Sequence, residues 1–269
     1  MLSLVVALPS EAQPLLEYFA LKPAESSPFR CYDNDEMQLV VSGIGVELCA
    51  AATGYAAGRR AEARTSPWFN LGICGHSHYA PGTLVIAGRV MATDRRYCWY
   101  PSLLLDHEFP VVTVISSPEP VTDYPEDACY DMEAAGFLTA ATRISGHDAC
   151  QVIKIVSDNH EHDIERLTRA MINQLVAARL ADIEALVEQS RSLLRQPDPD
   201  AWLGMHQDLA REFHFTATQE IELRQLCRRL YVLKVTEEAI RTISSSAHDA
   251  RSVLAACRLE VARLSPGFN

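Results

Sequence analysis

The chain has 269 residues, of which 48% are hydrophobic and 22% are charged. This length suits one large α/β domain with a small appendage, or two modest domains, and the composition excludes a disordered chain. The formal net charge of −11 argues against nonspecific nucleic-acid binding, because phosphate backbones recruit Lys and Arg.

The eight cysteines are scattered without a CxxC pair, so neither a zinc framework nor a redox motif is predicted, and we expect no metal or cofactor. No signal-peptide pattern precedes the strand-like residues 2–8, which favours a cytoplasmic protein with reduced thiols. No apolar run reaches the roughly 18 residues that a membrane helix needs. We therefore expect neither a membrane nor a nucleic acid as a partner.

Strand-like and helix-like segments alternate through the first part of the chain. Residues 2–8 are short, apolar and ended by Pro9, as in a buried strand, and Ser10 suits the N-cap of a following helix. Further strands are predicted over residues 38–42, 68–71, 83–90, 111–116 and 152–156, and further helices over residues 46–60 and 132–144. This alternation predicts an α/β fold with a mostly parallel or mixed sheet and helices on its faces.

The pattern changes after Asp163. Residues 164–194 have one long helical periodicity, which Pro197 and Pro199 would stop. Residues 201–269 contain no convincing strand; Thr216 or Thr218 would cap one helix there, and Ser246 or Asp249 another. We expect a first domain over residues 1–196 and an all-helical extension over residues 201–269.

Two carboxylates are the first site candidates. Glu133 opens the helix predicted after Tyr130-Asp131-Met132, and Asp158 follows the apolar run at residues 152–156. Ligands of open α/β sheets gather at the carboxyl ends of strands, which favours a binding or acid–base role. The alternatives are structural: an acid in a first helical turn complements the helix dipole, and Asp158 is also a suitable cap.

Glu11 is a third candidate, because it follows the first strand and should lie at the same end of the sheet as Asp158. Three such acids suit chemistry with an oxocarbenium-like transition state, in which one group protonates the leaving side and another activates the nucleophile. A first-turn helix acid is the structural alternative for Glu11.

Four segments, in order, resemble the superfamily of purine nucleoside phosphorylases and methylthioadenosine/S-adenosylhomocysteine nucleosidases. They are Val6-Ala7-Leu8-Pro9-Ser10-Glu11, Ser42-Gly43-Ile44-Gly45, Gly72-Ile73-Cys74-Gly75 with Gly82-Thr83-Leu84-Val85, and Asp131-Met132-Glu133-Ala134-Ala135-Gly136 with Val156-Ser157-Asp158. The last pair is the most specific. The resemblance covers about residues 1–194 and leaves residues 201–269 unexplained.

The resemblance implies a three-layer α/β/α fold around a central mixed sheet and cleavage of a nucleoside N-glycosidic bond. Glu133 would bind the ribose hydroxyls, with Met132 packed against the sugar. Asp158 would protonate the base at N7, and Glu11 would activate the attacking water. The remaining expected substrate contacts are Ser157, Gly75, Cys74 and Ile73.

Departures from the superfamily pattern concern the nucleophile and the base. Ile73 replaces the usual Ser or Thr, Asn70 replaces the phosphate-binding Arg of hexameric phosphorylases, and Thr83 replaces an Asp. These changes remove strong phosphate partners and favour water, while leaving open a degenerate site. The segment that follows Val114 has no aromatic residue before Tyr124, so base specificity is not carried over.

Other clusters have simpler interpretations. His76 with His78, and His160 with His162, are spaced like metal ligands, but solvated loop histidines or a polar substrate contact fit better. The aromatic residues 97–100 indicate core or a subunit contact. The basic residues of the extension alternate with acids, as on a solvated helix face.

These observations favour a hydrolytic nucleosidase, with a methylthioadenosine- or S-adenosylhomocysteine-like purine nucleoside as substrate and a homodimer as assembly. A phosphorylase of the same fold is the first alternative. The second is a non-catalytic nucleoside-binding or assembly protein with a degenerate site.

Overall fold

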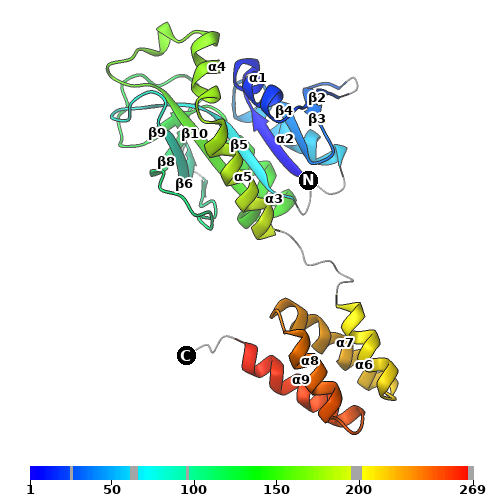
Figure 1. The fold of residues 1–269 in the computed structure, drawn as a ribbon. Coiled ribbons are helices and arrows are strands. Elements are labelled where there is room, and N and C mark those ends of the chain that lie inside the picture. The colour runs from blue at the N-terminus through cyan, green and yellow to red at the C-terminus, as the bar shows by residue number, and fades with distance from the viewer. Residues whose placement is uncertain (25–26, 61–65, 95–96, 195–201, 266–269) are drawn as a thin grey trace. The chain divides into compact units, whose positions relative to one another are not determined.

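The computed structural model describes residues 1–24, 27–60, 66–94, 97–194 and 202–265. The chain divides into two compact units, residues 1–194 and residues 195–269 (Figure 1). Within the described residues of the first unit, helices alternate with the strands of one mixed sheet, and the described residues of the second unit form helices without a strand.

The sheet of the first unit has the order β10-β6-β8-β9-β5-β1-β4-β3-β2, with β7 paired to β6. Its strands are β1 (Leu2–Val6), β2 (Lys22–Pro23), β3 (Arg30–Asp33), β4 (Met37–Val41), β5 (Trp68–His76), β6 (Leu84–Ala92), β7 (Cys98–Trp99), β8 (Val111–Ser116), β9 (Cys129–Asp131) and β10 (Cys150–Asp158). Because β10 also pairs with β5, the strands β5, β9, β8, β6 and β10 close into a ring.

Parallel pairing brings the predicted site segments to one edge of the sheet. The strand β1 runs parallel to β4 and β5, and β5 runs parallel to β10. Their carboxyl ends therefore lie together, so that Glu11, which follows β1, comes near the end of β5 and near Asp158, the last residue of β10.

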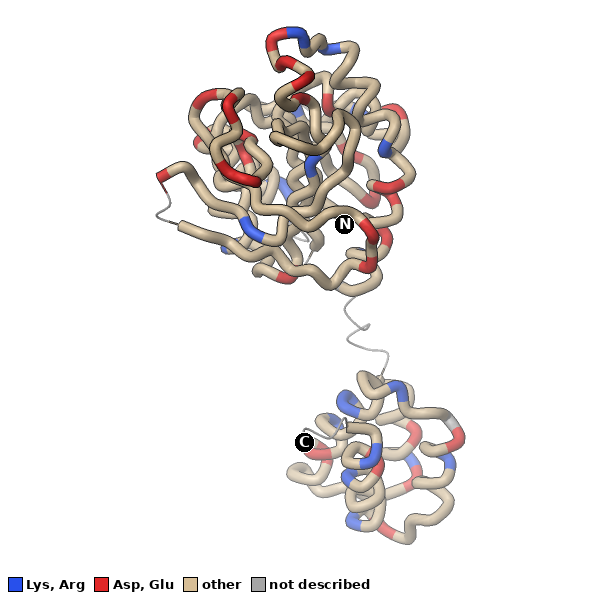
Figure 2. Tube along the Cα trace, turned by 90° about the vertical axis from the view of Figure 1, so that its left-hand side faces the viewer, with Lys and Arg blue, Asp and Glu red and all other residues tan. Residues whose placement is uncertain are grey.

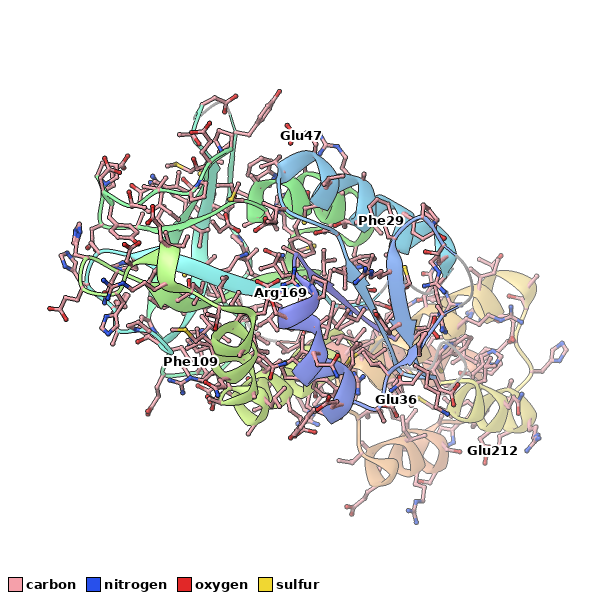
Figure 3. All side chains as sticks on the ribbon, turned by 90° about the horizontal axis from the view of Figure 1, so that it is seen from above. Phe29, Glu36, Glu47, Phe109, Arg169 and Glu212 are labelled. Carbon is pink, nitrogen blue, oxygen red and sulfur yellow. The ribbon has the colours of Figure 1, made fainter. Side chains whose placement is uncertain are left out.

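Helices cover both faces of the sheet, and each face has its own apolar core. The helices α2 (Val46–Arg59) and α3 (Ala134–Ser145) pack on one face, and α1 (Pro9–Tyr18), α4 (Arg169–Ala177) and α5 (Leu180–Leu194) pack on the other (Figure 3). Strand β1 shows why: Leu4 and Val6 enter the second core and Val5 the first, since alternate side chains point to opposite faces. The expected three-layer α/β/α arrangement is confirmed.

Close packing of α2 and α3 places Glu133 beside the turn that precedes α2. A Cβ atom on Gly136 would lie 2.0 Å from the carbonyl oxygen of Val46, so only glycine fits there. Glu133 is the N-cap of α3, and Gly45 is the N-cap of α2 with φ of 112°, which also suits glycine. The helix starts are therefore held together by two glycines of the predicted motifs.

The predicted strands and helices are found with shifts of a few residues, apart from one helix. Residues 164–194 do not form the single helix that was predicted. They form a short 3-10 turn (Ile164–Arg166) followed by the two helices α4 and α5. Thr168 caps α4 through the N–H of Met171, and the side chain of Arg179, in the turn between α4 and α5, donates to the carbonyl of Gly82 at 2.8 Å. The prolines expected to end this helix, Pro197 and Pro199, lie outside the described residues. The short strands β2, β3, β7 and β9 were not predicted.

The second unit is helical, as expected from its sequence. Its helices are α6 (Leu203–Glu212), α7 (Ala217–Val232), α8 (Glu237–Ser246) and α9 (Ala250–Leu264). Thr216 caps α7 and Asp249 caps α9, two of the caps foreseen, and leucines, valines and cysteines of these helices share one core. Both acidic and basic residues occur on these helices (Figure 2). In the described parts of both units, no helix has the length and apolarity required to span a bilayer.

Candidate active site

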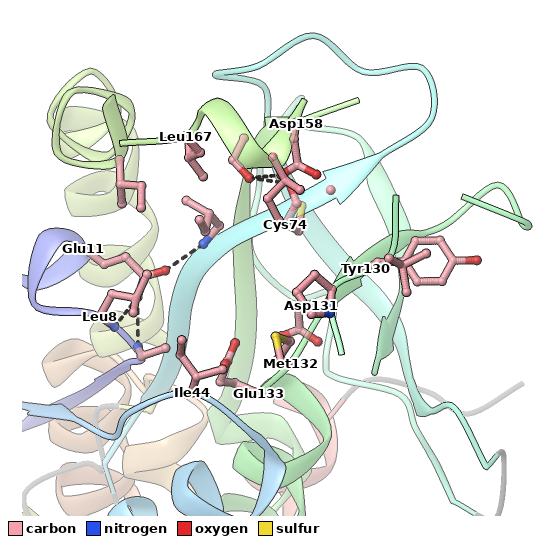
Figure 4. A pocket seen from close by; sticks show the side chains of 18 of the residues that line it. Leu8, Glu11, Ile44, Cys74, Tyr130, Asp131, Met132, Glu133, Asp158 and Leu167 are labelled. Atoms are coloured by element: carbon pink, nitrogen blue, oxygen red, sulfur yellow. Dashed lines mark hydrogen bonds between the residues drawn. The ribbon is translucent and has the colours of Figure 1, made fainter. Parts of the chain in front are cut away.

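A cavity of about 250 Å³ opens at the carboxyl edge of the sheet (Figure 4). Its walls come from the segment after β1, from the ends of β5 and β10, from the β8–β9 loop, and from the start of α3. All of the sequence-predicted site residues line it: Glu11, Ile73, Cys74, Gly75, Met132, Glu133, Ser157 and Asp158. The three candidate carboxylates thus share one cavity.

Glu11 is anchored by backbone donors from two strand ends. Its Oε2 accepts from the N–H groups of Ala7 and Leu8 at 2.9 and 2.8 Å, and its Oε1 accepts from the N–H of Ile73 at 3.0 Å (Figure 4). Burial raises the pKa of Glu11, and these donors together with the charge of Lys154 counter part of that rise. The carboxylate is therefore fixed in direction at the floor of the cavity.

Glu133 is held at one oxygen only. Its Oε1 accepts from the N–H of Gly45 at 3.0 Å, and no hydrogen bond from the described residues engages Oε2. Burial, and then the neighbouring charge of Asp131, raise the pKa of Glu133 to about 7. Since Glu133 and Met132 both line the cavity, a ligand that supplies hydroxyl donors would find a free carboxylate oxygen beside an apolar side chain.

A buried lysine that was not predicted from the sequence lies behind these acids. The Nζ of Lys154 is 2.7 Å from Oδ2 of Asp131, and both side chains are at most 1% exposed. Lys154 pairs in register with Gly72 of β5, and a Cβ there would lie 3.5 Å from Nζ and 2.9 Å from Oε1 of Glu11. The missing side chain of Gly72 therefore makes room for both charged groups.

Burial alone would lower the pKa of Lys154, but the carboxylates of Asp131 and Glu133 raise it above its usual value. Asp131 also accepts from the Ser116 hydroxyl at 2.6 Å and from the N–H of Ala134 at 2.8 Å. Lys154 thus stays charged and paired below the cavity. The only sequence signal for it was a lysine inside an apolar strand run.

Asp158 receives hydroxyl donors at both oxygens. Ser157 Oγ donates to Oδ1, and the hydroxyl of Tyr124 donates to Oδ2 at 2.5 Å. Burial, and then the hydrogen bond and charge of Asp158, raise the pKa of Tyr124. Tyr124 was noted in the sequence only as the first aromatic residue of its loop, and it does not line the cavity; Glu119, Pro120 and Val121 of that loop do.

Several residues singled out in the sequence lie away from the cavity. Asn70 is buried and donates to the carbonyl of Val5, and Thr83 donates to the carbonyl of Ala80. The Nδ1 of His76 accepts from the N–H groups of His78 and Tyr79, and burial lowers the pKa of this histidine. Among the described residues, no group of histidines, cysteines or acids has the arrangement of a metal site.

Comparison with known proteins gives a match at the level of structure. No protein-family model and no curated protein matches the sequence. Solved structures do match. Futalosine hydrolase of Helicobacter pylori strain 26695 is 15% identical with a TM-score of 0.57, over 70% of this chain and 97% of that chain.

Two further similar structures are nucleosidases. The 5′-methylthioadenosine/S-adenosylhomocysteine nucleosidase of S. pneumoniae is 17% identical with a TM-score of 0.56, over 70% of this chain and 98% of that one. The 5′-methylthioadenosine nucleosidase of Arabidopsis thaliana is 15% identical with a TM-score of 0.57, over 73% of this chain and 96% of that one. The chain therefore shares its fold, over about 70% of its length, with these three hydrolases.

Proposed function

We propose that the first unit is a nucleosidase, which hydrolyses the N-glycosidic bond of a purine nucleoside with water. The observation that carries this proposal is the single cavity bordered by Glu11, Glu133 and Asp158, in a fold shared with N-ribosyl hydrolases. The fold alone allows many activities, so the activity is set by the chemistry of each carboxylate.

The ribose binds at Glu133. A carboxylate accepts a pair of hydrogen bonds from vicinal hydroxyls, and Oε2 of Glu133 is free to take them while Oε1 stays on the N–H of Gly45. Met132 gives the sugar an apolar contact beside that carboxylate. Ionised Glu133 also stabilises the positive charge that develops on the ribose ring in the transition state.

The base lies toward Asp158. As the bond between C1′ and N9 breaks, its electron pair goes to the base, and the Asp158 carboxyl donates a proton to N7. Ser157, Cys74 and Gly75 line the cavity at this end and shape the base site. The departing base is then neutral.

Water attacks from the side of Glu11. Three backbone N–H groups fix the Glu11 carboxylate, which accepts a proton as the oxygen of water bonds to C1′. The products are the free sugar and the neutral base, which carries the proton at N7. Asp158 ends without its proton and Glu11 with one, so exchange with solvent restores both groups.

Water fits this cavity better than phosphate. Among the described residues that line the cavity, none is Lys or Arg, whereas Glu11, Glu119, Asp131, Glu133 and Asp158 are acids. The nearby cation, Lys154, is already neutralised by Asp131 at 2.7 Å. A phosphate dianion would meet repulsion without a charge-assisted donor, which argues against a phosphorylase.

The substrate we favour is a methylthioadenosine- or S-adenosylhomocysteine-like purine nucleoside, in which an apolar thioether is attached to C5′ of the ribose. Ile44 lies beside Glu133 at the ribose end, and Leu8 lies beside Glu11 (Figure 4). Ile164, Leu167 and Ile172 add to this apolar lining. The thioether on C5′ would pack against these apolar side chains and lose its contact with water.

We further propose a cytoplasmic homodimer. The described cysteines form no disulfide, which is consistent with a reducing compartment. Tyr97, Tyr100 and Leu104 are 67%, 65% and 63% exposed, and Leu103 and Val111 are also exposed near them in the chain. Exposed aromatic and aliphatic residues of this kind are typical of subunit contacts.

The test is incubation of the full chain with a nucleoside panel, with and without phosphate, followed by chromatography of the free base. The panel holds adenosine, inosine, guanosine, uridine, 5′-methylthioadenosine and S-adenosylhomocysteine. We expect base release at the same rate with and without phosphate, and its loss in Glu11→Gln. Release only with phosphate would show a phosphorylase, and bound but uncleaved nucleoside would show a binding protein.

A further inference from the structure

Tyr124 reaches the proposed proton donor from outside the cavity. It lies in the loop between β8 and β9, it is buried, and its hydroxyl donates to Oδ2 of Asp158 at 2.5 Å. Oxygen–oxygen distances of about 2.5–2.7 Å are typical of a hydroxyl that donates to an ionised carboxylate. With Ser157 on Oδ1, each oxygen of Asp158 has a hydroxyl directed at it.

The backbone at Tyr124 is held in an unfavourable conformation to achieve this. Its φ is 39°, in the left-handed region that a bulky side chain rarely adopts. Such a conformation is unfavourable and persists only where the surroundings impose it. The surroundings here are His160, edge-on to the ring at 5.1 Å, and Tyr130 at 6.1 Å.

The side chains of Asp158 and Tyr124 also contact the main chain at Gly75. A Cβ atom on Gly75 would lie 2.6 Å from Oδ2 of Asp158 and 2.7 Å from Cε1 of Tyr124. Carboxylate and ring therefore lie directly on the β5 backbone, where any residue other than glycine would displace them. The contact is constrained from the loop, from the ring neighbours and from the sheet.

We propose that Tyr124 is a positioning residue that makes Asp158 a stronger proton donor. This inference rests on the proposed hydrolysis. When Asp158 gives its proton to the base nitrogen, the negative charge left behind falls on the carboxylate. The hydroxyls of Tyr124 and Ser157 already point at its oxygens, so they stabilise that charge without reorganisation.

The first test compares Tyr124→Phe with the wild type on the purine nucleoside that the panel identifies. This change keeps the ring and removes the donor. Loss of one hydrogen bond to a charged group predicts a kcat lower by about 10- to 100-fold, with KM changed less than about twofold. Tyr79→Phe is the matched control, because Tyr79 lies outside the cavity lining and packs on His76 at 4.5 Å.

A second substrate separates proton donation from a general structural effect. In 4-nitrophenyl β-D-ribofuranoside the leaving nitrophenolate needs no proton. We expect Tyr124→Phe to cleave it as fast as the wild type does, whereas Glu133→Gln loses activity on both substrates. Equal losses of Tyr124→Phe on both substrates, or no loss on the nucleoside, would overturn the proposal.

Proton NMR tests the hydrogen bond between Tyr124 and Asp158 independently of activity. The short hydrogen bond predicts a proton NMR resonance far downfield in the free wild-type protein, absent from Tyr124→Phe and from Asp158→Asn and present in Tyr79→Phe. If the wild type releases no base from any compound, the hydrolase assignment fails while the resonance still reports on the pair. Its absence from the wild type would overturn the inference.

Discussion

The Nζ of Lys154 lies 2.7 Å from Oδ2 of Asp131, at a depth where both side chains are at most 1% exposed. Two strands that are not neighbours, β9 and β10, supply the pair, and Gly72 of the intervening β5 leaves the space for it. The ion pair neutralises one acid of the site and leaves Glu11 and Glu133 to act on a ligand.

Removing the lysine charge should destabilise the first unit strongly. Lys154→Met leaves the Asp131 carboxylate buried without a counter-charge, for which a loss of about 3–5 kcal/mol is expected. Asp131→Asn combined with Lys154→Met removes both charges and should recover part of that loss. Urea denaturation monitored by circular dichroism measures the free energy of unfolding of both variants. An unchanged unfolding midpoint in Lys154→Met would contradict the stabilising role of the ion pair.

The pKa of Glu133, about 7, predicts a pH-dependent KM. The ribose hydroxyls need the ionised carboxylate as acceptor. KM should therefore rise as the pH falls below about 7, because protonation of Glu133 reduces its capacity to accept hydrogen bonds. Steady-state kinetics between pH 5.5 and 8.5 measure this dependence. A KM that stays constant across the range would show that Glu133 does not hold the sugar.

The same raised pKa predicts a gain in stability when Glu133 is made neutral. Between the ordinary carboxyl value of 4.5 and about 7, the folded state binds more protons than the unfolded chain, so stability falls as the pH rises through this window. At pH 8, Glu133→Gln should therefore be more stable than the wild type by about 1–3 kcal/mol, although inactive. At pH 4 the two proteins should unfold at similar urea concentrations.

Gly75→Ala tests the geometry at Asp158. The added Cβ would lie 2.6 Å from Oδ2 of Asp158, so the carboxylate must move, and a displacement of about 1 Å costs about 100-fold in rate. Gly54→Ala is the control, because a Cβ there meets nothing within 4 Å. We expect kcat/KM to fall only in Gly75→Ala, with both variants folded by circular dichroism.

Gly136→Ala tests the helix contact that places Glu133. A Cβ only 2.0 Å from the Val46 carbonyl oxygen forces α2 and α3 apart, with an expected loss of at least about 1–3 kcal/mol. Gly58→Ala, in the open part of α2, should instead stabilise slightly through helix propensity. Thermal unfolding of the two variants should therefore shift in opposite directions.

The sequence predicted those site residues that belong to short contiguous motifs. Glu133 and Asp158 were recognisable because each belongs to a short contiguous motif beside a predictable strand or helix end. Lys154 was not, since a lysine in an apolar run indicates only a strand residue until Gly72 and Asp131 are placed around it. Tyr124 was missed for the same reason: its loop has no periodic pattern, and its contact with Asp158 spans 34 positions.

The fold followed from alternating strands and helices, but two details did not. The strand β9 has three residues, too few for a periodic pattern, although it carries Asp131 into the site. The break between α4 and α5 lies in a stretch without proline or glycine, where helical periodicity continues. The hydrogen bond from Arg179 to Gly82, a tertiary contact, accompanies the turn there.

The most direct test of the account is the source of the oxygen on the released sugar. The full chain is incubated in ¹⁸O-labelled water with phosphate and the nucleoside that the panel identifies. The released sugar is reduced with borohydride at once, and its mass is measured by mass spectrometry. Hydrolysis by water predicts free sugar carrying one ¹⁸O atom at C1′ and no sugar phosphate. Sugar 1-phosphate as the product, or retention of intact nucleoside without cleavage, would contradict it.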